Sequence, residues 1–178
     1  MYITDSSAPL LFVLRSGSDT LEVVRSPLFR SLQGVAEIPT RHQLVVADYS
    51  HGLLRVDLRT RAVTRIADAA GSTSLGVDGI VWDNGSIVGV QNKIEPARIV
   101  SFALDDSLTR ISRVALLDRQ ADVADEPTIG TVWRGGFVYV ANSQWEKYDD
   151  SGKRRTGTSL HPTHLIYVPL ARIERPRH

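Results

Sequence analysis

Short apolar runs separated by turn-forming residues follow one another along the chain, and three of them end in the same way. In each, an apolar stretch closes with an acid or an amide, at residues 45–48, 89–92 and 139–142. A turn signal precedes each of these runs, and an apolar run that begins near a glycine precedes each turn. The glycines are Gly34, Gly79 and Gly130, so the pattern repeats after 45 and 51 residues. This is the length of one four-stranded propeller blade.

Two further runs extend the repeat. Residues 53–58, 99–104 and 164–168 match one another as a third strand, and residues 62–66 and 110–114 follow the first two of them as a fourth. These outer runs alternate arginine with valine or isoleucine, which is typical of strands that bury one face. The inner runs are more uniformly apolar, as strands buried on both faces are. The sequence therefore predicts an all-β fold, a β-propeller of four-stranded antiparallel blades.

The two ends of the chain predict that this propeller is incomplete. Residues 2–5 match the end of a second strand, and residues 10–15 and 20–25 fill the third and fourth positions, so the innermost strand of that blade is absent. At the other end only a third strand is clear, and residues 171–178 form a basic tail that we expect to fray. Open blade edges favour self-association. We expect two full and two partial blades within residues 1–170, at about 1–28, 29–70, 74–120 and 126–170.

Two blade openings are specific enough to compare with known families. Residues 76–90 carry Val-Asp-Gly-Ile-Val at the start of an inner run, and residues 32–48 carry Leu-Gln-Gly-Val at the same place. The first resembles the Pro-Asp-Gly opening, and the second the Asn-Gly-Leu blade, of the senescence marker protein/gluconolactonase family. The resemblance runs over about residues 1–170. It implies a six-bladed parent fold, a divalent metal such as Ca²⁺ in the central channel, and hydrolysis of a lactone or related ester.

The same resemblance implies metal ligands. Members of the family use a Glu, two Asn and an Asp at the entrances of inner strands. By motif, the Asp corresponds to Asp78 and one Asn corresponds to Gln33, whereas the Glu and the second Asn would lie upstream of Met1. Asp78 would then be both metal ligand and catalytic residue, beside a metal that polarises the ester carbonyl. With half of the ligands missing, we expect the C-terminal part of a gluconolactonase-like propeller, inactive alone.

A second interpretation remains open for each of these residues. Asp78 has the position of a residue that caps the turn before its strand, and Gln33 is longer than the Asn it replaces. Ile129 aligns with Asp78, so the last blade offers no ligand in register. The alternative function is a non-catalytic propeller module that binds a ligand or a protein partner on its rim, because a fold does not fix a function.

Candidate rim residues come from the ends of the second strands. Asp48, Asn92 and Asn142 lie where these strands leave the sheet. They predict either a polar ring that contacts substrate or caps of the turns that follow. Trp145 follows the last of them closely and is a candidate to stack on a ligand.

Composition excludes several classes of function. The net charge of the 178 residues is +1, which gives no indication of nucleic-acid or membrane binding. The absence of cysteine excludes disulfides, thiol catalysis and cysteine-ligated zinc. No apolar run is long enough to predict a transmembrane helix, and residues 1–5 lack the features of a signal peptide. The compartment stays open.

Overall fold

The computed structural model describes residues 1–39, 41–119 and 125–170, and these form four antiparallel sheets. In the described part of the chain no α-helix occurs, and η1 (Trp145–Lys147) is a single turn of 3₁₀ helix. No described helix has the length and apolar character needed to cross a membrane.

The first sheet contains β1 (Tyr2–Asp5), β2 (Leu10–Leu14) and β3 (Leu21–Val24). The second contains β4 (Leu32–Ile38), β5 (Gln43–Asp48), β6 (Gly52–Asp57) and β7 (Val63–Arg65). The third contains β8 (Val77–Asp83), β9 (Ser86–Gln91), β10 (Arg98–Leu104) and β11 (Ile111–Arg119), and the fourth β12 (Gly130–Trp133), β13 (Gly136–Val140) and β14 (Leu165–Pro169).

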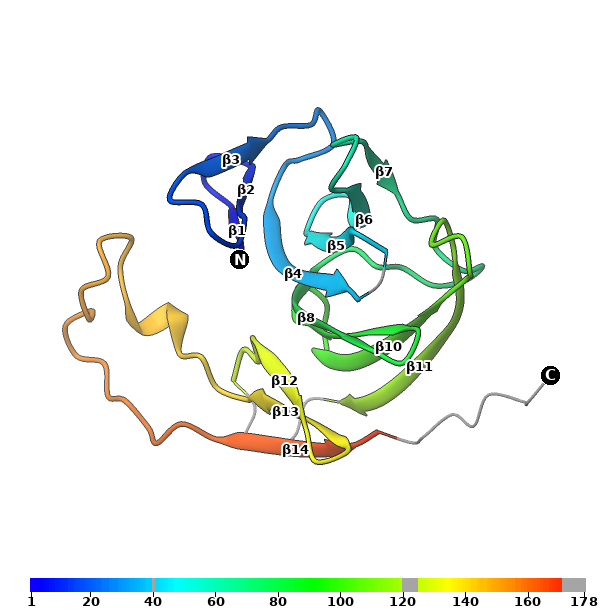
Figure 1. Cartoon of the computed structure of the whole chain (residues 1–178). Coiled ribbons are helices and arrows are strands. Elements are labelled where there is room, and N and C mark those ends of the chain that lie inside the picture. The colour runs from blue at the N-terminus through cyan, green and yellow to red at the C-terminus, as the bar shows by residue number, and fades with distance from the viewer. Residues whose placement is uncertain (40, 120–124, 171–178) are drawn as a thin grey trace.

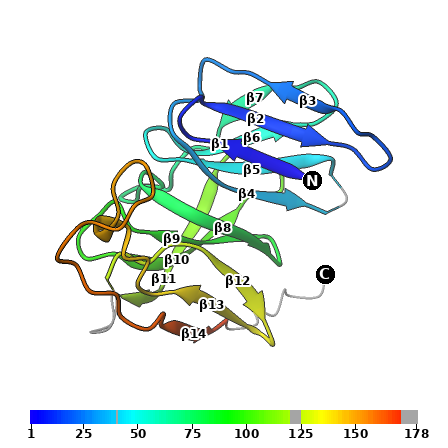
Figure 2. The same cartoon turned by 90° about the vertical axis from the view of Figure 1, so that its left-hand side faces the viewer.

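The sheets follow one another around a centre. In Figure 1, β4, β8 and β12 lie on the inner side, and β7, β11 and β14 on the outer side. Figure 2 shows the first and fourth sheets at the two ends of this series. Within each sheet, strands that are consecutive in the chain are neighbours, which is the connectivity that a blade of an antiparallel propeller requires.

Three apolar clusters fill the spaces between consecutive sheets. The first and second sheets meet through residues such as Leu11 and Val46, the second and third through Ala47 and Phe102, and the third and fourth through a cluster that includes Phe137. Side chains alternate between the faces of a strand, so Val46 and Ala47 of β5 lie on opposite faces. Both are fully buried. Burial on both faces explains why the inner runs of the sequence are uniformly apolar.

The repeated glycines mark places where inner strands approach closely. A Cβ on Gly34 would lie 2.7 Å from the carbonyl oxygen of Asp78, and a Cβ on Gly79 would lie 2.7 Å from the Cα of Ile129. Only glycine permits this approach of two backbones. The contacts also set the register between sheets, because Gly34 lies against Gly79 and Gly79 against Ile129. The expected alignment of Ile129 with Asp78 is therefore wrong by one residue, and Thr128 is the counterpart of Asp78.

The strands agree with most of the predicted runs. The three strands of the first sheet lie where second, third and fourth strands were predicted, and the fourth sheet has three strands in its described part. The predicted fourth strand at residues 110–114 is longer in the structure, because β11 continues to Arg119 along β10. The basic tail predicted at residues 171–178 lies outside the described residues. All four sheets support an all-β, propeller-like architecture.

Candidate functional site

The predicted site residue Asp78 lies in a polar cluster that spans three sheets. Its Oδ2 accepts hydrogen bonds from Asn92 Nδ2 at 3.0 Å and from Thr128 Oγ1 at 2.7 Å. Asn92 Nδ2 also donates to the carbonyl of Pro127 at 2.9 Å, and Asn92 Oδ1 accepts from the Tyr49 hydroxyl at 2.8 Å. We call Tyr49, Asp78, Asn92 and Thr128 the inner polar cluster. All four are half-buried.

Each member arrives from the end of a strand or from the residues beside it. Asp78 is the second residue of β8, at an irregularity in the pairing of β8 with β9, and Asn92 directly follows β9. Tyr49 follows β5, and Thr128 precedes β12. The ends of neighbouring sheets therefore meet here, and hydrogen bonds join the second sheet to the third and the third to the fourth.

Negative charge gathers around the inner polar cluster. Burial, and then the charge of Asp78, raise the pKa of Tyr49 to about 12, so its hydroxyl keeps its proton at neutral pH. Burial and the nearby carboxylate of Glu146 raise the pKa of Glu126, with smaller contributions from Asp125 and Asp78 in the same direction. Glu126 has a positive φ of 55°, which is uncommon for a residue other than glycine.

The contacts of Asp78 and Gln33 test whether the implied calcium ion fits. Calcium takes six to eight oxygen ligands, yet Asn92 presents its NH₂ group to Asp78, and Thr128 donates a proton to the same carboxylate oxygen. Gln33 Nε2 points toward Ser31, at 3.3 Å from its Oγ. Among the described residues no group of three or more His, Asp or Glu side chains is placed to hold a metal. As arranged here, these side chains supply few of the oxygen ligands that calcium needs, and the assignment of Asp78 and Gln33 stays a prediction.

Two of the predicted rim residues serve the backbone around them. Asp48 is fully buried, and its carboxylate accepts four backbone N–H groups, from Arg30, Ser31, Ser50 and His51. Asn142 donates to the carbonyl of Pro162 and accepts the N–H of His164. These contacts favour the interpretation of both residues as caps.

The third rim residue, Asn92, differs because it lies one position later in its sheet. Asp48 pairs with Leu32 in β4, whereas Gln91 pairs with Val77 in β8. Gln91 is therefore the counterpart of Asp48, and its Nε2 binds two carbonyls of the segment that leads into β8, at Thr73 and Leu75. Asn92 is thereby left to join the inner polar cluster. The one-residue offset could not be found from the aligned ends of the runs.

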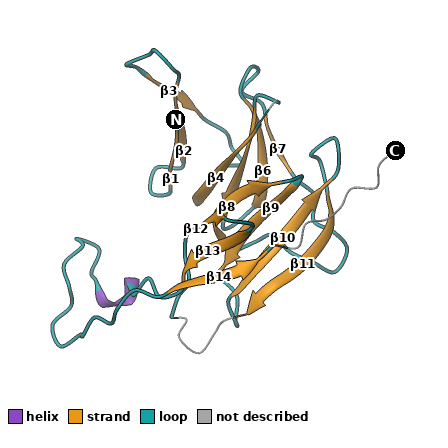
Figure 3. Ribbon diagram, turned by 60° about the horizontal axis from the view of Figure 1, so that its bottom comes forward, coloured by secondary structure: helices purple, strands orange, loops and turns teal. Residues whose placement is uncertain are grey.

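Trp145 lies in a second place of interest, the loop between β13 and β14. This loop extends away from the sheets and carries η1 (Figure 3). The side chain of Trp145 is 66% exposed. It borders a depression of about 660 Å³, which we call the rim depression; its lining residues are Ser143, Trp145, Tyr148, Asp149, Asp150 and Gly152.

Hydrogen bonds hold the loop in place at both ends. Gln144 donates to the carbonyl of His161 and accepts its N–H, and Asp149 N donates to the carbonyl of Lys153. Ser143 Oγ lies 3.4 Å from Glu126 Oε2, which brings that carboxylate to the side of the rim depression. Sequence reasoning identified Trp145 but missed Tyr148 and Asp150. The signal in the sequence was Tyr148 beside two acids, Asp149 and Asp150, in the long segment between two predicted strands.

Comparisons with known proteins extend the account of the fold. No family model and no curated protein matches this chain. A β-propeller chain in the crystal structure of a nidogen/laminin complex superposes with a TM-score of 0.58 and 13% sequence identity, over 92% of this chain and 77% of that chain. Identity at this level shows the fold alone. The chain described here thus has an all-β, propeller-like fold.

Proposed function

We propose that this chain is a non-catalytic, propeller-like module that binds a polyhydroxylated ring, such as a sugar or a sugar lactone, in the rim depression. One observation carries the proposal: the largely exposed Trp145 borders a depression that also contains an aromatic ring, a hydroxyl group and two carboxylates. An exposed large aromatic side chain in a hollow is characteristic of binding sites.

The chemistry of the lining residues suits this class of ligand. The C–H face of a pyranose or lactone ring can lie flat on the indole of Trp145 or the ring of Tyr148. The hydroxyl groups of the ligand can donate to the carboxylate oxygens of Asp149 and Asp150. Asp149 Oδ1 already accepts hydrogen bonds within its own turn, from Ser151 and from the Lys153 N–H, so its position is fixed before a ligand arrives. Ser143 adds a hydroxyl group to the lining.

Titration with D-glucose and with glucono-δ-lactone, followed by calorimetry, tests the proposal. We expect saturable binding of at least one of them and its loss in Trp145→Ala. Trp133→Ala is the matched control, because Trp133 is also half exposed (52%) but lies in β12 with the Arg134 guanidinium 4.5 Å from its ring centre. Binding that survives Trp145→Ala, or no binding of either probe to the folded chain, contradicts the proposal.

The finer fold assignment belongs to the same proposal: the four sheets are blades of an incomplete propeller whose parent has six. The outward faces of the end sheets support it. Leu165 and Tyr167 of β14 are exposed, at 66% and 46%, and alternate with residues that pack on the third sheet. Ile3 of β1 is 42% exposed on the outward side of the first sheet. Such faces favour association, and sedimentation that shows only monomer would contradict the expected self-association.

The gluconolactonase-like hydrolase remains the second candidate, on the observation that no described donor contacts Asp78 Oδ1. If this oxygen binds a cation, calcium should raise the melting temperature of the chain, and Asp78→Asn should remove that rise. If calcium leaves the melting temperature unchanged, this candidate is excluded for the isolated chain. The rim-depression proposal is unaffected by that result.

A further inference from the structure

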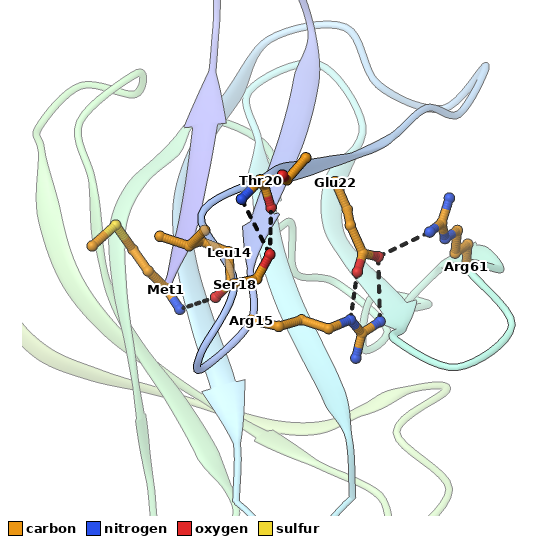
Figure 4. Close-up of polar contacts among 7 residues, drawn as sticks. All are labelled: Met1, Leu14, Arg15, Ser18, Thr20, Glu22 and Arg61. Atoms are coloured by element: carbon orange, nitrogen blue, oxygen red, sulfur yellow. Dashed lines mark hydrogen bonds and ion pairs between the residues drawn. The ribbon is translucent and has the colours of Figure 1, made fainter.

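The inner edge of the first sheet has no strand beside it in the described part of the chain. β1 pairs only with β2, in a sheet of three strands. Met1 N donates to the carbonyl of Leu14 at 2.8 Å (Figure 4), and Met1 O accepts from Leu14 N at 2.9 Å. Because antiparallel pairs alternate, Tyr2 and Thr4 direct their N–H and C=O groups away from β2. These four groups form an open edge.

The corresponding edge of the second sheet shows what such an edge binds. Asp5 Oδ1 accepts the N–H groups of Ser7 and Ala8, at 2.9 and 3.0 Å, and Asp48 Oδ1 accepts those of Ser50 and His51, at the same distances. The two aspartates therefore end β1 and β5 in the same way. Asp48 Oδ2 accepts two more N–H groups, from Arg30 and Ser31, which lead into the inner strand β4. No described donor reaches Asp5 Oδ2.

We propose that β1 is a docking edge for an extended peptide strand supplied by a partner polypeptide. The strand pairs antiparallel with β1 through Tyr2 and Thr4. Two successive N–H groups at the start of the strand bind Asp5 Oδ2, as Arg30 and Ser31 bind Asp48. Addition of a strand to a sheet edge is an established mode of peptide recognition. This inference is independent of the rim depression.

The position of β1 also defines the sequence that the docked strand needs. In the second sheet, Gly34 allows β4 to lie within contact of the β8 backbone, where a Cβ would be 2.7 Å from two backbone atoms. β1 lies beside β4 in turn, with the Thr4 hydroxyl donating to the carbonyl of Gln33. A strand added to β1 must therefore carry a small residue where it crosses β4, followed by apolar residues, as Val35 and Ala36 follow Gly34.

An acetylated, fluorescently labelled peptide with the sequence of residues 28–39 of this chain is the probe, because it contains both the N–H donors and the glycine. We expect saturable binding to the full chain by fluorescence anisotropy, and none for a scrambled peptide. We further expect bound peptide to slow hydrogen exchange at the Tyr2 and Thr4 amides. Exchange at these amides that is already slow without peptide, including through a dimer paired along β1, overturns the proposal.

Asp5→Asn is the decisive variant. Asparagine keeps an oxygen for the N–H groups of Ser7 and Ala8 but places an NH₂ group, which cannot accept, where the peptide N–H groups must bind. We expect affinity to fall about tenfold or more, since two hydrogen bonds to a charged acceptor are lost. Asp57→Asn is the matched control, because Asp57 Oδ1 caps an equivalent turn at Arg59 and Thr60 away from this edge. Equal affinity of the Asp5→Asn variant and the wild type refutes the docking geometry.

Discussion

The first and second sheets share one local structure, at the ends of β1 and β5, and differ in what surrounds it. Both have a strand that ends in an aspartate whose Oδ1 caps the following turn. In the second sheet an inner strand lies beside that strand, and Asp48 is fully buried by it. In the first sheet no described strand occupies that place, and among the described residues Asp5 contacts only its own turn. The comparison teaches that the second oxygen decides the role of such an aspartate. Asp48 Oδ2 has partners and stabilises the fold, whereas Asp5 Oδ2, which no described donor contacts, is the atom that we propose for binding.

The largest expected effect is the contrast between Asp48→Asn and Asp5→Asn. Asp48→Asn leaves the part-buried N–H groups of Arg30 and Ser31 without an acceptor, which should lower the free energy of unfolding by about 2 kcal/mol. Asp5→Asn should change it little, because its turn contacts persist. Urea unfolding of the two variants measures this contrast. Equal losses of stability would mean that the two aspartates have the same surroundings.

A smaller effect is expected where the second sheet contacts the third. Gly34→Ala would press a methyl group on the backbone of β8 and should cost about 2 kcal/mol, in the range of overpacked cores. Gly71→Ala serves for comparison: Gly71 lies in a turn at φ 73° with no atom near its missing Cβ, so this variant reports backbone strain without a steric contact. If Gly34→Ala unfolds at the wild-type urea concentration, β4 does not lie against β8 as described.

The smallest effect concerns the two ion pairs of Glu22, of which the pair with Arg61 ties the first sheet to the second. Glu22 of β3 accepts from Arg15 at 2.6 Å and from Arg61, in the turn after β6, at 2.9 Å (Figure 4). The hydrogen bond from Arg15 is the main cause that lowers the pKa of Glu22 below its ordinary value of 4.5. The pairs are exposed, so we expect only a slight fall in melting temperature for Glu22→Gln at neutral pH.

The direction of the pKa shift of Glu22 determines how this fall in melting temperature depends on pH. A carboxyl whose pKa is lowered in the folded state stabilises it above the unfolded-state pKa, and this contribution disappears as the pH falls through the folded-state value. The difference in melting temperature between wild type and Glu22→Gln should therefore shrink as the pH falls from 4.5 toward the lowered folded-state pKa of Glu22, and vanish below that pKa. A difference that persists in acid would assign the effect to packing of the side chain.

Much of the fold could be predicted from local pattern, because alternation, turn residues and the recurring glycines each have a local cause. Gly34 and Gly79 indicated repeats, and the structure gives the reason in the close contact of inner strands. The site was less predictable. The partner of Asp78 on the fourth sheet is Thr128 rather than a residue aligned with Ile129, since register between sheets depends on contacts distant in sequence. The rim depression is formed by a long loop, and the repeat pattern of the sequence does not predict the conformation of that loop.

Hydrogen exchange of the free chain at single amides tests the central comparison most directly. Thr4 and Tyr2 of β1 should exchange rapidly, whereas Val45, in the same place in β5 and paired with Ala36 of β4, should be strongly protected. Rapid exchange at β1 beside slow exchange at Val45 supports an open inner edge that is available for a partner strand. Equal protection at the two places would contradict the account, because it would mean that the edge of β1 is already covered.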